Sequence, residues 1–340
     1  MDGQHRDPDR SLPTLSVVVP NYNHGRYIEG ALRGHLTQTA PPIEILVVDD
    51  GSTDDSCEVV ERVASTAPNL RLIRLAGNVG VNAAINRGLT EVRGEFVCFS
   101  AADDVVGPDF ARRSLELIAR HPAAAFCFSD PAEMDGEQGG VHPLPLRLAD
   151  RPCLLRPPDV EALLTRNFFA FPGHATIYRR KTLIALGGFI EDLRWYADWF
   201  TSCVLAFRQG ACYVPEVMAY YRLSRQSYYM SGIRQTAVQR ELLYRVLDLL
   251  GSNQFRDVAP AFRRAALTPE FRLRVLRWLA VSPRHRDYLT PRLSARLAVR
   301  GVWWVMKPYM PGWVRPGMRR LARRWARVSS LRRAPRVTAE

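Results

Sequence analysis

The chain has 340 residues, enough to bury a sizeable core, and its 47% hydrophobic and 24% charged residues are ordinary for a globular protein. The formal net charge of +13 and the pI near 9.9 are unusual, and they predict attraction to a polyanion such as nucleic acid, an anionic membrane or a phosphorylated substrate. The six cysteines form no CxxC pair, which argues against a zinc site or a disulfide framework and favours reduced core residues of a cytosolic protein. Residues 1–13 are polar, so we expect no secretory signal, and no apolar run approaches the roughly 18 residues of a spanning helix.

Short apolar runs alternate with amphipathic segments over the first 130 residues. Strands are predicted at 15–19, 43–48, 70–75, 96–99 and 123–129, and helices at 27–38, 54–63, 82–90 and from Pro108 onward. This alternation indicates βαβ units and a mostly parallel sheet. Residues 131–158 are rich in proline, glycine and charge and are predicted to form a loop or lid. Two helices at 183–188 and 196–209 and a last strand at 213–222 follow, and beyond residue 231 the pattern predicts helices only.

Pairs of acidic residues follow two of the predicted strands. Asp49 and Asp50 end the second strand, and Asp103 and Asp104 end the stretch 96–104, which begins with the buried run 96–99. In an open α/β sheet, ligands bind beyond the carboxyl ends of the strands. Paired carboxylates there can hold a hard divalent cation, which in turn can hold a diphosphate. The alternative is a polar loop in which Asp103 or Asp104 caps a helix.

Taken in order, these segments resemble the family 2 glycosyltransferases, which have the GT-A fold, a Rossmann-like, mostly parallel sheet flanked by helices. The resemblance covers about residues 14–224. It is carried by SVVVPNYN at 16–23, ILVVDDGSTD at 45–54, NVG at 78–80, AAINRGL at 83–89, SAADD at 100–104, GGF at 187–189 and ADW at 197–199. It implies an inverting transfer of sugar from a nucleotide-diphosphate sugar to an acceptor hydroxyl that depends on a divalent metal. The implied acceptor is a glycan, a lipid-linked molecule or a small molecule.

The resemblance also implies which residues bind the donor. Pro20 and Tyr22, after the first strand, are expected to face the nucleobase, and Asp50 is expected to accept a base N–H, whereas Asp49 holds the turn. Asn82 and Asn86 lie one helical turn apart, so one of them could reach the ribose or base while the other orients the loop. A turn aromatic without a ligand is the alternative for Tyr22.

Asp103 and Asp104 are then the ribose and metal residues of the donor site. The resemblance implies that Asp104 ligates Mg²⁺ or Mn²⁺ and that Asp103 reaches the sugar or ribose. Many relatives carry an aspartate where this chain has Ala101. The cation would therefore depend more on phosphate oxygens and water, which suits Mg²⁺.

Asp198 is the expected general base, because an inverting transfer needs a carboxylate near the acceptor hydroxyl. Relatives usually place an acidic pair before the tryptophan, and here Ala197 takes the first position. An N-cap for the following helix is the alternative role of Asp198, and Glu191 and Asp192 are the nearby substitutes.

Four further residues are expected on the acceptor or diphosphate side: His174, Trp199, Arg222 and Arg225. A lone histidine is more often a satisfied core residue, which is the alternative for His174. Relatives often carry a histidine where this chain has Ser224, and Arg222 or Arg225 could supply that missing positive charge.

The predicted organisation is a disordered tail at 1–13, a GT-A domain at 14–228 and a basic helical extension at 229–340. Arginine, tryptophan and leucine mixed over 292–325 fit an interfacial helix on an anionic membrane, which predicts a cytoplasmic enzyme with peripheral contact at the inner face of the membrane. Helices packed on the core with a solvated arginine face are the alternative, and nucleic acid is not an expected partner. The rival functions are a catalytically degenerate GT-A module that acts as a scaffold and a nucleotidyltransferase, although the latter lacks its glycine-rich basic loop after the first strand.

Overall fold

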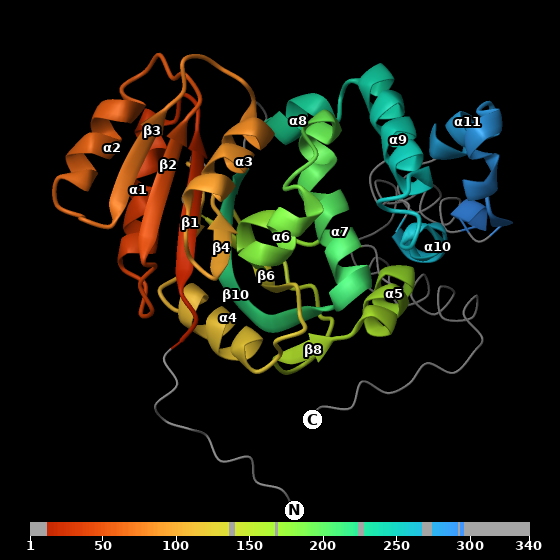
Figure 1. The fold of residues 1–340 in the computed structure, drawn as a ribbon, viewed down its shortest axis with the longest axis horizontal. Coiled ribbons are helices and arrows are strands. Elements are labelled where there is room, and N and C mark those ends of the chain that lie inside the picture. Colours follow the sequence, from red (N-terminus) through yellow and green to blue (C-terminus); the bar gives the residue numbers. More distant parts are fainter. Residues whose placement is uncertain are drawn as a thin grey trace, which may run out of the picture. The chain divides into compact units, whose positions relative to one another are not determined.

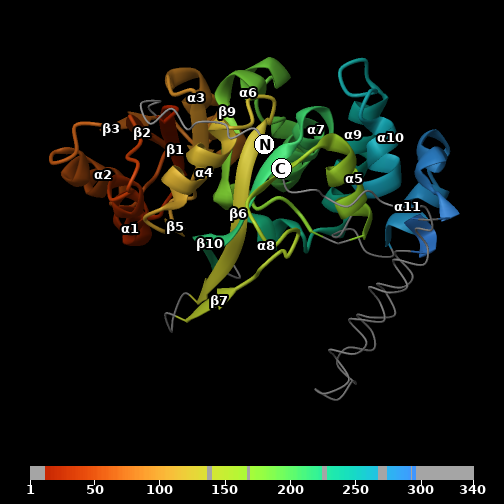
Figure 2. The ribbon, with the colours of Figure 1, turned by 90° about the horizontal axis from the view of Figure 1, so that it is seen from below.

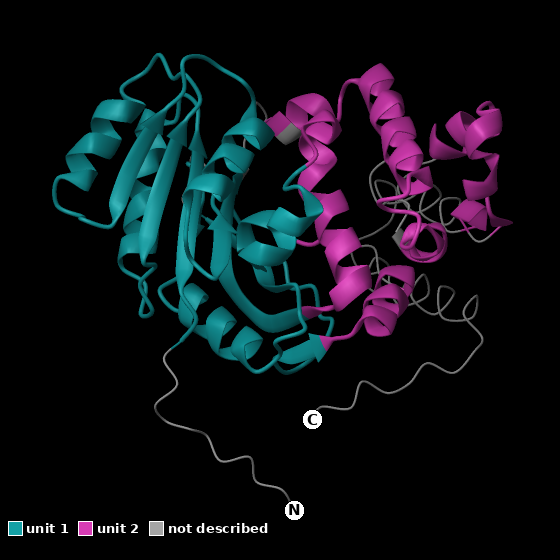
Figure 3. Cartoon of the chain, viewed as in Figure 1, with its two compact units in different colours: residues 1–154, 172–189, 212–223 teal, residues 155–171, 190–211, 224–340 magenta. Residues whose placement is uncertain are grey.

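The computed structural model describes residues 12–135, 140–166, 169–223, 228–266, 274–291 and 293–295. As far as it is described, the chain divides into two compact units (Figure 3). The first comprises residues 1–154, 172–189 and 212–223, and the second comprises 155–171, 190–211 and 224–340. The predicted boundary at residue 228, between a GT-A domain and a helical extension, differs from the limits of these two units and stays a prediction.

The first unit is built on a mixed sheet whose strand order is β3-β2-β1-β4-β9-β6-β10-β5, with β7 beside β6 and β8 beside β10 (Figure 1). Strands β1, β2, β3 and β4 are parallel, and β9 runs antiparallel between β4 and β6. The strands are β1 (Leu15–Asn21), β2 (Glu44–Asp49), β3 (Leu70–Arg74), β4 (Phe96–Phe99), β5 (Val105–Val106), β6 (Phe126–Asp135), β7 (Val141–Pro143), β8 (Cys153–Leu155), β9 (Thr176–Arg179) and β10 (Ala211–Leu223). The helices are α1 (Gly25–Leu36), α2 (Ser56–Ala64), α3 (Val81–Glu91), α4 (Phe110–Ala119), η1 (Gly173–Ala175) and α6 (Arg180–Leu186).

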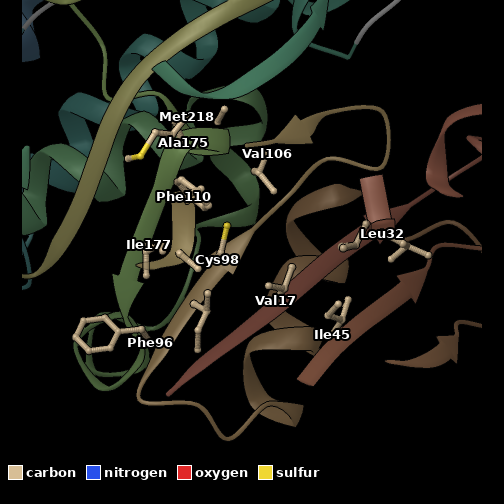
Figure 4. Packing of buried hydrophobic residues seen from close by; sticks show 14 of the residues in the cluster. Val17, Leu32, Ile45, Phe96, Cys98, Val106, Phe110, Ala175, Ile177 and Met218 are labelled. Atoms are coloured by element: carbon tan, nitrogen blue, oxygen red, sulfur yellow. The ribbon is translucent and has the colours of Figure 1, made fainter. Parts of the chain in front are cut away.

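Both faces of the sheet are covered, which explains why β1 and β2 are buried along nearly their whole length. Val17 on one face joins a core with Leu32 of α1, Ile45 of β2 and Phe110 of α4 (Figure 4). The next residue of the strand points to the opposite face, because side chains alternate along a strand. That face carries α3, and Figure 2 shows α3 and α6 on the side of the sheet opposite α1.

Helix α3 approaches the sheet closely at Gly88. A Cβ atom built at this glycine would lie 2.3 Å from Cγ1 of Val18 and 3.3 Å from Cγ2 of Val48. No larger side chain fits there without moving the helix or the valines. Gly88 therefore sets how near α3, and the loop that precedes it, lie to the strands of the site.

The prediction of a loop or lid over residues 131–158 is wrong in part. Pro131 to Asp135 continue β6 and pair with β10 across shifts in register, and β7, β8 and the start of α5 also lie within the segment. Proline lacks an N–H donor and usually argues against a strand. Pro131 is tolerated because it pairs at an irregular point next to the Val217/Ala219 register shift, where its carbonyl accepts the N–H of Leu144 at 2.9 Å.

The second unit is helical. Its elements are α5 (Pro157–Arg166), η2 (Glu191–Tyr196), α7 (Ala197–Gln209), α8 (Tyr228–Gly232), α9 (Thr236–Gly251), α10 (Ala259–Ala261), η3 (Phe262–Ala266), α11 (Arg274–Ala280) and η4 (Pro283–Tyr288). Phe200 of α7 packs against Phe255 and Phe262 with ring centroids 5.2 and 5.5 Å apart. Arg208 forms two hydrogen bonds with the carboxylate of Asp257, which ties the end of α7 to the segment before α10.

Two predictions made for the termini fall largely on residues that the structure leaves undescribed. These are the disordered tail predicted over residues 1–13, of which only 12 and 13 are described, and the interfacial helix predicted over 292–325, of which only 293–295 are described. Within the described ranges, no helix combines the length and the apolar character that crossing a bilayer requires. None of the six cysteines, all of which lie within the described ranges, forms a disulfide, and five of them are buried.

Candidate functional site

The carboxyl ends of β1, β2 and β4 meet at one edge of the first unit, because these strands are parallel neighbours. At this edge Asp49 holds the turn after β2: its carboxylate accepts hydrogen bonds from Nδ2 of Asn21 at 2.7 Å and from the backbone N–H of Ser52 at 2.9 Å. The structural role predicted for Asp49 is thus seen directly in its contacts.

Asp50 holds a second loop at the same edge. Its side chain is buried, and its two oxygens accept the backbone N–H groups of Val79 at 2.7 Å and Gly80 at 2.9 Å. This links the end of β2 to the turn that precedes α3. A carboxylate oxygen has two lone pairs, so these contacts leave acceptor capacity for a base N–H.

Pro20 and Tyr22 lie beside this loop at the end of β1. Pro20 pairs with Val48 of β2, and Tyr22 follows the strand with 43% of its surface exposed. Val79, in the loop that Asp50 holds, is 60% exposed. Large exposed apolar side chains at a strand edge are suited to the faces of a planar ligand.

Asn86 orients a loop, whereas Asn82 lies half-buried in the first turn of α3. Nδ2 of Asn86 donates to the carbonyl of Phe189 at 2.8 Å, and Oδ1 accepts the N–H of Phe189 at 2.8 Å. Gly188, with φ +77°, lies under this pair, and a Cβ there would lie 2.4 Å from Oδ1 of Asn86. Asn86 therefore fixes the turn after α6, which is the loop-orienting role expected for one of the two asparagines.

Asp104 is buried, and Asp103 beside it is half-buried. Neither caps the next helix, since the N-cap of α4 is Asp109. Burial, followed by the negative charge of Asp103, raises the pKa of Asp104 to about 8, although a hydrogen bond from the backbone N–H of Arg222 acts in the opposite direction. That N–H lies 3.0 Å from Oδ1 of Asp104. A buried acid with this profile gains from a cation nearby.

The guanidinium of Arg222 lies over the ring of Tyr27 at 4.5 Å, and its Nε donates weakly to the carbonyl of Asp103 at 3.4 Å. A fixed positive charge thus stands beside the two acids. Arg225 and Ser224 lie outside the described residues.

The acids suit a hard divalent cation, which prefers carboxylate oxygens. They provide only part of a coordination shell, and no cluster of three or more metal-ligating side chains occurs within the described ranges. The remaining ligands would have to come from phosphate oxygens and water, as expected from Ala101.

His174 lies in η1, next to β4 and β6, and its ring contacts Tyr221 with centroids 5.1 Å apart. Tyr221 donates to Glu133 at 3.3 Å. Burial lowers the pKa of His174 to about 4, so the ring is neutral near pH 7. Its Nε2 is buried without a hydrogen-bond partner in the described part of the chain, which differs from the satisfied core histidine considered as the alternative.

Asp198 and Trp199 lie in the second unit, in the first turn of α7. The N-cap of this helix is Tyr196, and Oδ1 of Asp198 accepts the N–H of Trp199 at 2.7 Å. The side chain is exposed, yet the surrounding protein raises its pKa to about 6 by desolvation. Asp198 therefore lies in the first turn of α7 and is not its N-cap, and its carboxylate accepts a hydrogen bond from the N–H of the next residue. Of its substitutes, Asp192 pairs with Arg245 at 2.9 Å.

Sequence reasoning missed several of these contacts. It assigned Arg222 through its charge, whereas the structure also gives its backbone a role at Asp104. It did not single out Tyr221, which contacts His174, or Glu133, which accepts a hydrogen bond from Tyr221.

A sheet with acids gathered at the carboxyl ends of its parallel strands is the architecture of enzymes that bind nucleotides at that edge. A family model described as "Glycosyl transferase family 2" matches residues 16–187, just over half of the chain, and the chain therefore belongs to this family of glycosyltransferases. The predictions of family, fold class and enzyme class are confirmed.

Three of the relatives in sequence are named as uncharacterized glycosyltransferases. One from Nostoc sp. is 29% identical over 228 residues, which cover 66% of this chain and 69% of the relative. One from Haemophilus influenzae is 29% identical over 223 residues, which cover 64% of this chain and 82% of the relative. Another, YibD of Escherichia coli, is 40% identical over 129 residues, 36% of this chain and 37% of the relative.

Among solved structures, residues 1–349 of S. aureus TarS in complex with UDP-GlcNAc match with a TM-score of 0.57 and 20% identity. The match covers 81% of this chain and 80% of that one. GalNAc-T7 with UDP, GalNAc and Mn²⁺ matches with a TM-score of 0.51 and 15% identity over 63% of this chain and 44% of that one. At these identities the likeness establishes the fold.

Proposed function

We propose that the protein is an inverting glycosyltransferase that transfers a sugar from a nucleotide-diphosphate sugar to an acceptor hydroxyl. The observation that carries the proposal is the acidic edge of a family 2 domain, where Asp50 follows β2 and Asp103 and Asp104 follow β4, the two parallel strands on either side of β1. The complexes of TarS with UDP-GlcNAc and of GalNAc-T7 with UDP support a nucleotide-sugar donor.

The first unit is assigned to the donor. Tyr22 and Pro20 would contact the nucleobase, Asp50 would accept a base N–H, Asn82 would reach the ribose or base, and Asp103 the ribose or sugar. Arg222 would place its charge near the diphosphate, because its guanidinium is held beside Asp103 by the ring of Tyr27.

Asp104 is the residue proposed to hold Mg²⁺ or Mn²⁺. A bound cation would supply positive charge for the negative charge that develops on the leaving diphosphate. The Mn²⁺ in the GalNAc-T7 complex supports a divalent metal without deciding between the two ions. His174 would lie on the diphosphate or acceptor side, where its neutral ring can exchange a hydrogen bond without adding charge.

The second unit is assigned to the acceptor, with Asp198 as general base and Trp199 beside it. The Asp198 carboxylate takes the proton of the acceptor hydroxyl, and the oxygen attacks the anomeric carbon. The bond from that carbon to the diphosphate breaks, and its electron pair leaves with the diphosphate. A base with a pKa of about 6 is largely ionised at neutral pH and still basic enough to assist.

Asp198→Asn tests the assignment of the base. The variant keeps the size of the side chain and an oxygen for the N–H of Trp199, so the fold and donor binding should persist while turnover falls about 10²–10⁴-fold. Asp192→Asn is the matched control, because Asp192 is a nearby exposed acid whose partner is Arg245, and its turnover should stay within about twofold. Near-normal turnover of Asp198→Asn would refute the assignment.

Calorimetry with UDP, GDP and dTDP, each with and without Mg²⁺ or Mn²⁺, tests donor binding. A catalytically degenerate scaffold, which the departures at Ala101, Ala197 and Ser224 would suit, is expected to bind none of them. Binding that Asp104→Ala weakens only in the presence of the metal would support the proposed metal residue.

Peripheral contact with an anionic membrane, which would bring a lipid-linked acceptor within reach, is supported by the net charge of +13. Sedimentation with vesicles of anionic and of neutral lipids tests it. Equal recovery with both would contradict the proposal.

A further inference from the structure

Two guanidinium groups lie over the ring of Tyr27, a residue in the first turn of α1. The guanidinium carbon of Arg222 is 4.5 Å from the ring centroid, and that of Arg26 is 5.3 Å from it. Arg222 belongs to β10, and the two elements meet because α1 packs against β5, which pairs with β10 (Figure 2). The Tyr27 ring therefore holds together two positive charges that come from separate elements of the first unit.

Both positive charges lack a counter-charge at contact distance. Within the described ranges, neither Arg26 nor Arg222 forms an ion pair with a carboxylate, whereas Arg33, further along α1, pairs with Glu29 at 2.6 Å. Arg26 is exposed and Arg222 is half-buried, so both residues are open to solvent. Like charges held near one another repel, and an anion that contacts both replaces this repulsion with attraction. The pair is therefore suited to an anionic ligand by its charge and by its exposure.

Arg222 brings this charge to the acids of the donor edge. Its backbone N–H lies 3.0 Å from Oδ1 of Asp104, its Nε lies 3.4 Å from the carbonyl of Asp103, and its charge acts to lower the pKa of Asp104. The two acids supply only part of a coordination shell for a cation, because Ala101 carries no carboxylate. A diphosphate bound at this edge would therefore meet guanidinium groups as well as any metal ion.

The ring of Tyr27 restricts where these two long side chains point. An arginine side chain loses rotamer freedom when a ligand orders it. The attraction between a guanidinium and the face of an aromatic ring favours one arrangement before a ligand arrives, which lowers the entropy cost of binding. The planar fork of a guanidinium matches two oxygens of one phosphate group. A diphosphate has one phosphate group for each of the two guanidiniums.

We infer that Tyr27 is a positioning residue that presents Arg26 and Arg222 together to the diphosphate of the donor. Because the charge of a guanidinium is permanent, part of the affinity for a diphosphate then does not depend on a metal ion. A nucleoside monophosphate offers one phosphate group to the two guanidiniums and is bound more weakly. The inference rests on the proposed function for the identity of the ligand, and it adds Tyr27 and Arg26 to the residues of the donor site.

Binding is measured in EDTA at fixed ionic strength, so that neither a metal ion nor catalysis contributes. The probes are UDP, GDP and dTDP and, for the one that binds best, the matching monophosphate and nucleoside; calorimetry is used for the diphosphates and NMR titration for the weaker ligands. We expect the wild-type protein to bind the diphosphate about tenfold more tightly than the monophosphate. Tyr27→Leu and Arg26→Gln should each weaken diphosphate binding about three- to tenfold and leave nucleoside binding unchanged. Tyr27→Phe, which keeps the ring, should lose less than about twofold, and so should the control Arg33→Gln, which removes a charge from the same helix.

A double-mutant cycle separates positioning from packing. In a protein that carries both Arg26→Gln and Arg222→Gln, Tyr27→Leu should weaken diphosphate binding by less than about twofold, because the ring then has no guanidinium to hold. A loss as large as in the wild-type background, or an equal loss for the nucleoside, would reveal a merely structural role and overturn the inference. Wild-type diphosphate affinity in Tyr27→Leu, or no diphosphate binding in EDTA, would also overturn it, and sugar transfer by such a protein would leave the proposed function standing. Diphosphate binding with the expected pattern in a protein that transfers no sugar from any nucleotide sugar would refute the proposed function and leave the inferred role of Tyr27 standing.

Discussion

Asp50 joins two loops of the donor edge, and replacing it with asparagine separates its structural role from its role toward a ligand. The carboxylate accepts two buried N–H bonds, at 2.7 and 2.9 Å. A hydrogen bond to a charged group is worth about 1.5–3 kcal/mol. Asparagine keeps one oxygen and turns an N–H₂ group toward a backbone N–H, so Asp50→Asn should lose about 2–3 kcal/mol of unfolding free energy. In a unit of this size the thermal midpoint should fall by about 4–12 °C.

The assay combines thermal unfolding with calorimetric binding of a nucleoside diphosphate. Asp55→Asn is the matched control, because Asp55 is a nearby exposed aspartate at the N-cap of α2 and its side chain forms no cap hydrogen bond. It should unfold like the wild type. If Asp50→Asn also unfolds like the wild type, the loop-holding argument is refuted. A destabilised variant with an unchanged order of preference among UDP, GDP and dTDP would refute contact between Asp50 and the base.

Three further predictions follow from buried or titrating groups. Asn86→Ala should lower the free energy of unfolding in urea by about 2–4 kcal/mol, because both backbone groups of Phe189 lose their partner. Thr90→Ala, on the exposed face of α3, should lower it by less than about 0.5 kcal/mol, and equal losses in the two variants would contradict the argument. Burial lowers the pKa of His35 to about 4 from its ordinary 6.5, so as the pH falls the unfolded chain binds a proton at this residue before the folded chain does. The contribution of His35 to stability should be full above pH 6.5 and fall toward pH 4 by up to about 3 kcal/mol. His35→Leu should flatten this pH dependence when the free energy of unfolding is measured at several pH values. With a pKa of about 6 for Asp198, kcat should fall about tenfold per pH unit below 6, and a kcat profile level from pH 7 to pH 4.5 would contradict its role as base.

Much of the fold could be predicted from sequence because its strands are short, apolar and bounded by residues that favour turns. The runs ending at Asp50 and before Asp103 carry both the burial signal and the acids, so strand ends and candidate residues were found together. The segment after Pro131 was missed for a physical reason. Its pairing depends on β10, about 90 residues away along the chain, and on register shifts that no local pattern encodes.

The contacts that define the site could not be predicted from the sequence either, because they join residues that are far apart along the chain. The N–H of Arg222 reaches Asp104 across 118 residues of sequence, and Asn86 meets Phe189 across 103. Residue type alone suggested charge at Arg222 and a polar contact at Asn86. It could not say that the first would act through its backbone, or that the second would be taken up by a turn.

The closeness of α3 to the sheet has a consequence for how this chain can vary. The space that a methyl group would need at position 88 is occupied by Val18, so the two positions share one fixed volume. Gly88→Ala alone should overfill this volume, and Val18→Ala alone should leave a cavity. In the double variant, the methyl group introduced at position 88 would take the space left by the valine methyl groups. Substitution at either position is therefore expected to be tolerated best when the other changes with it.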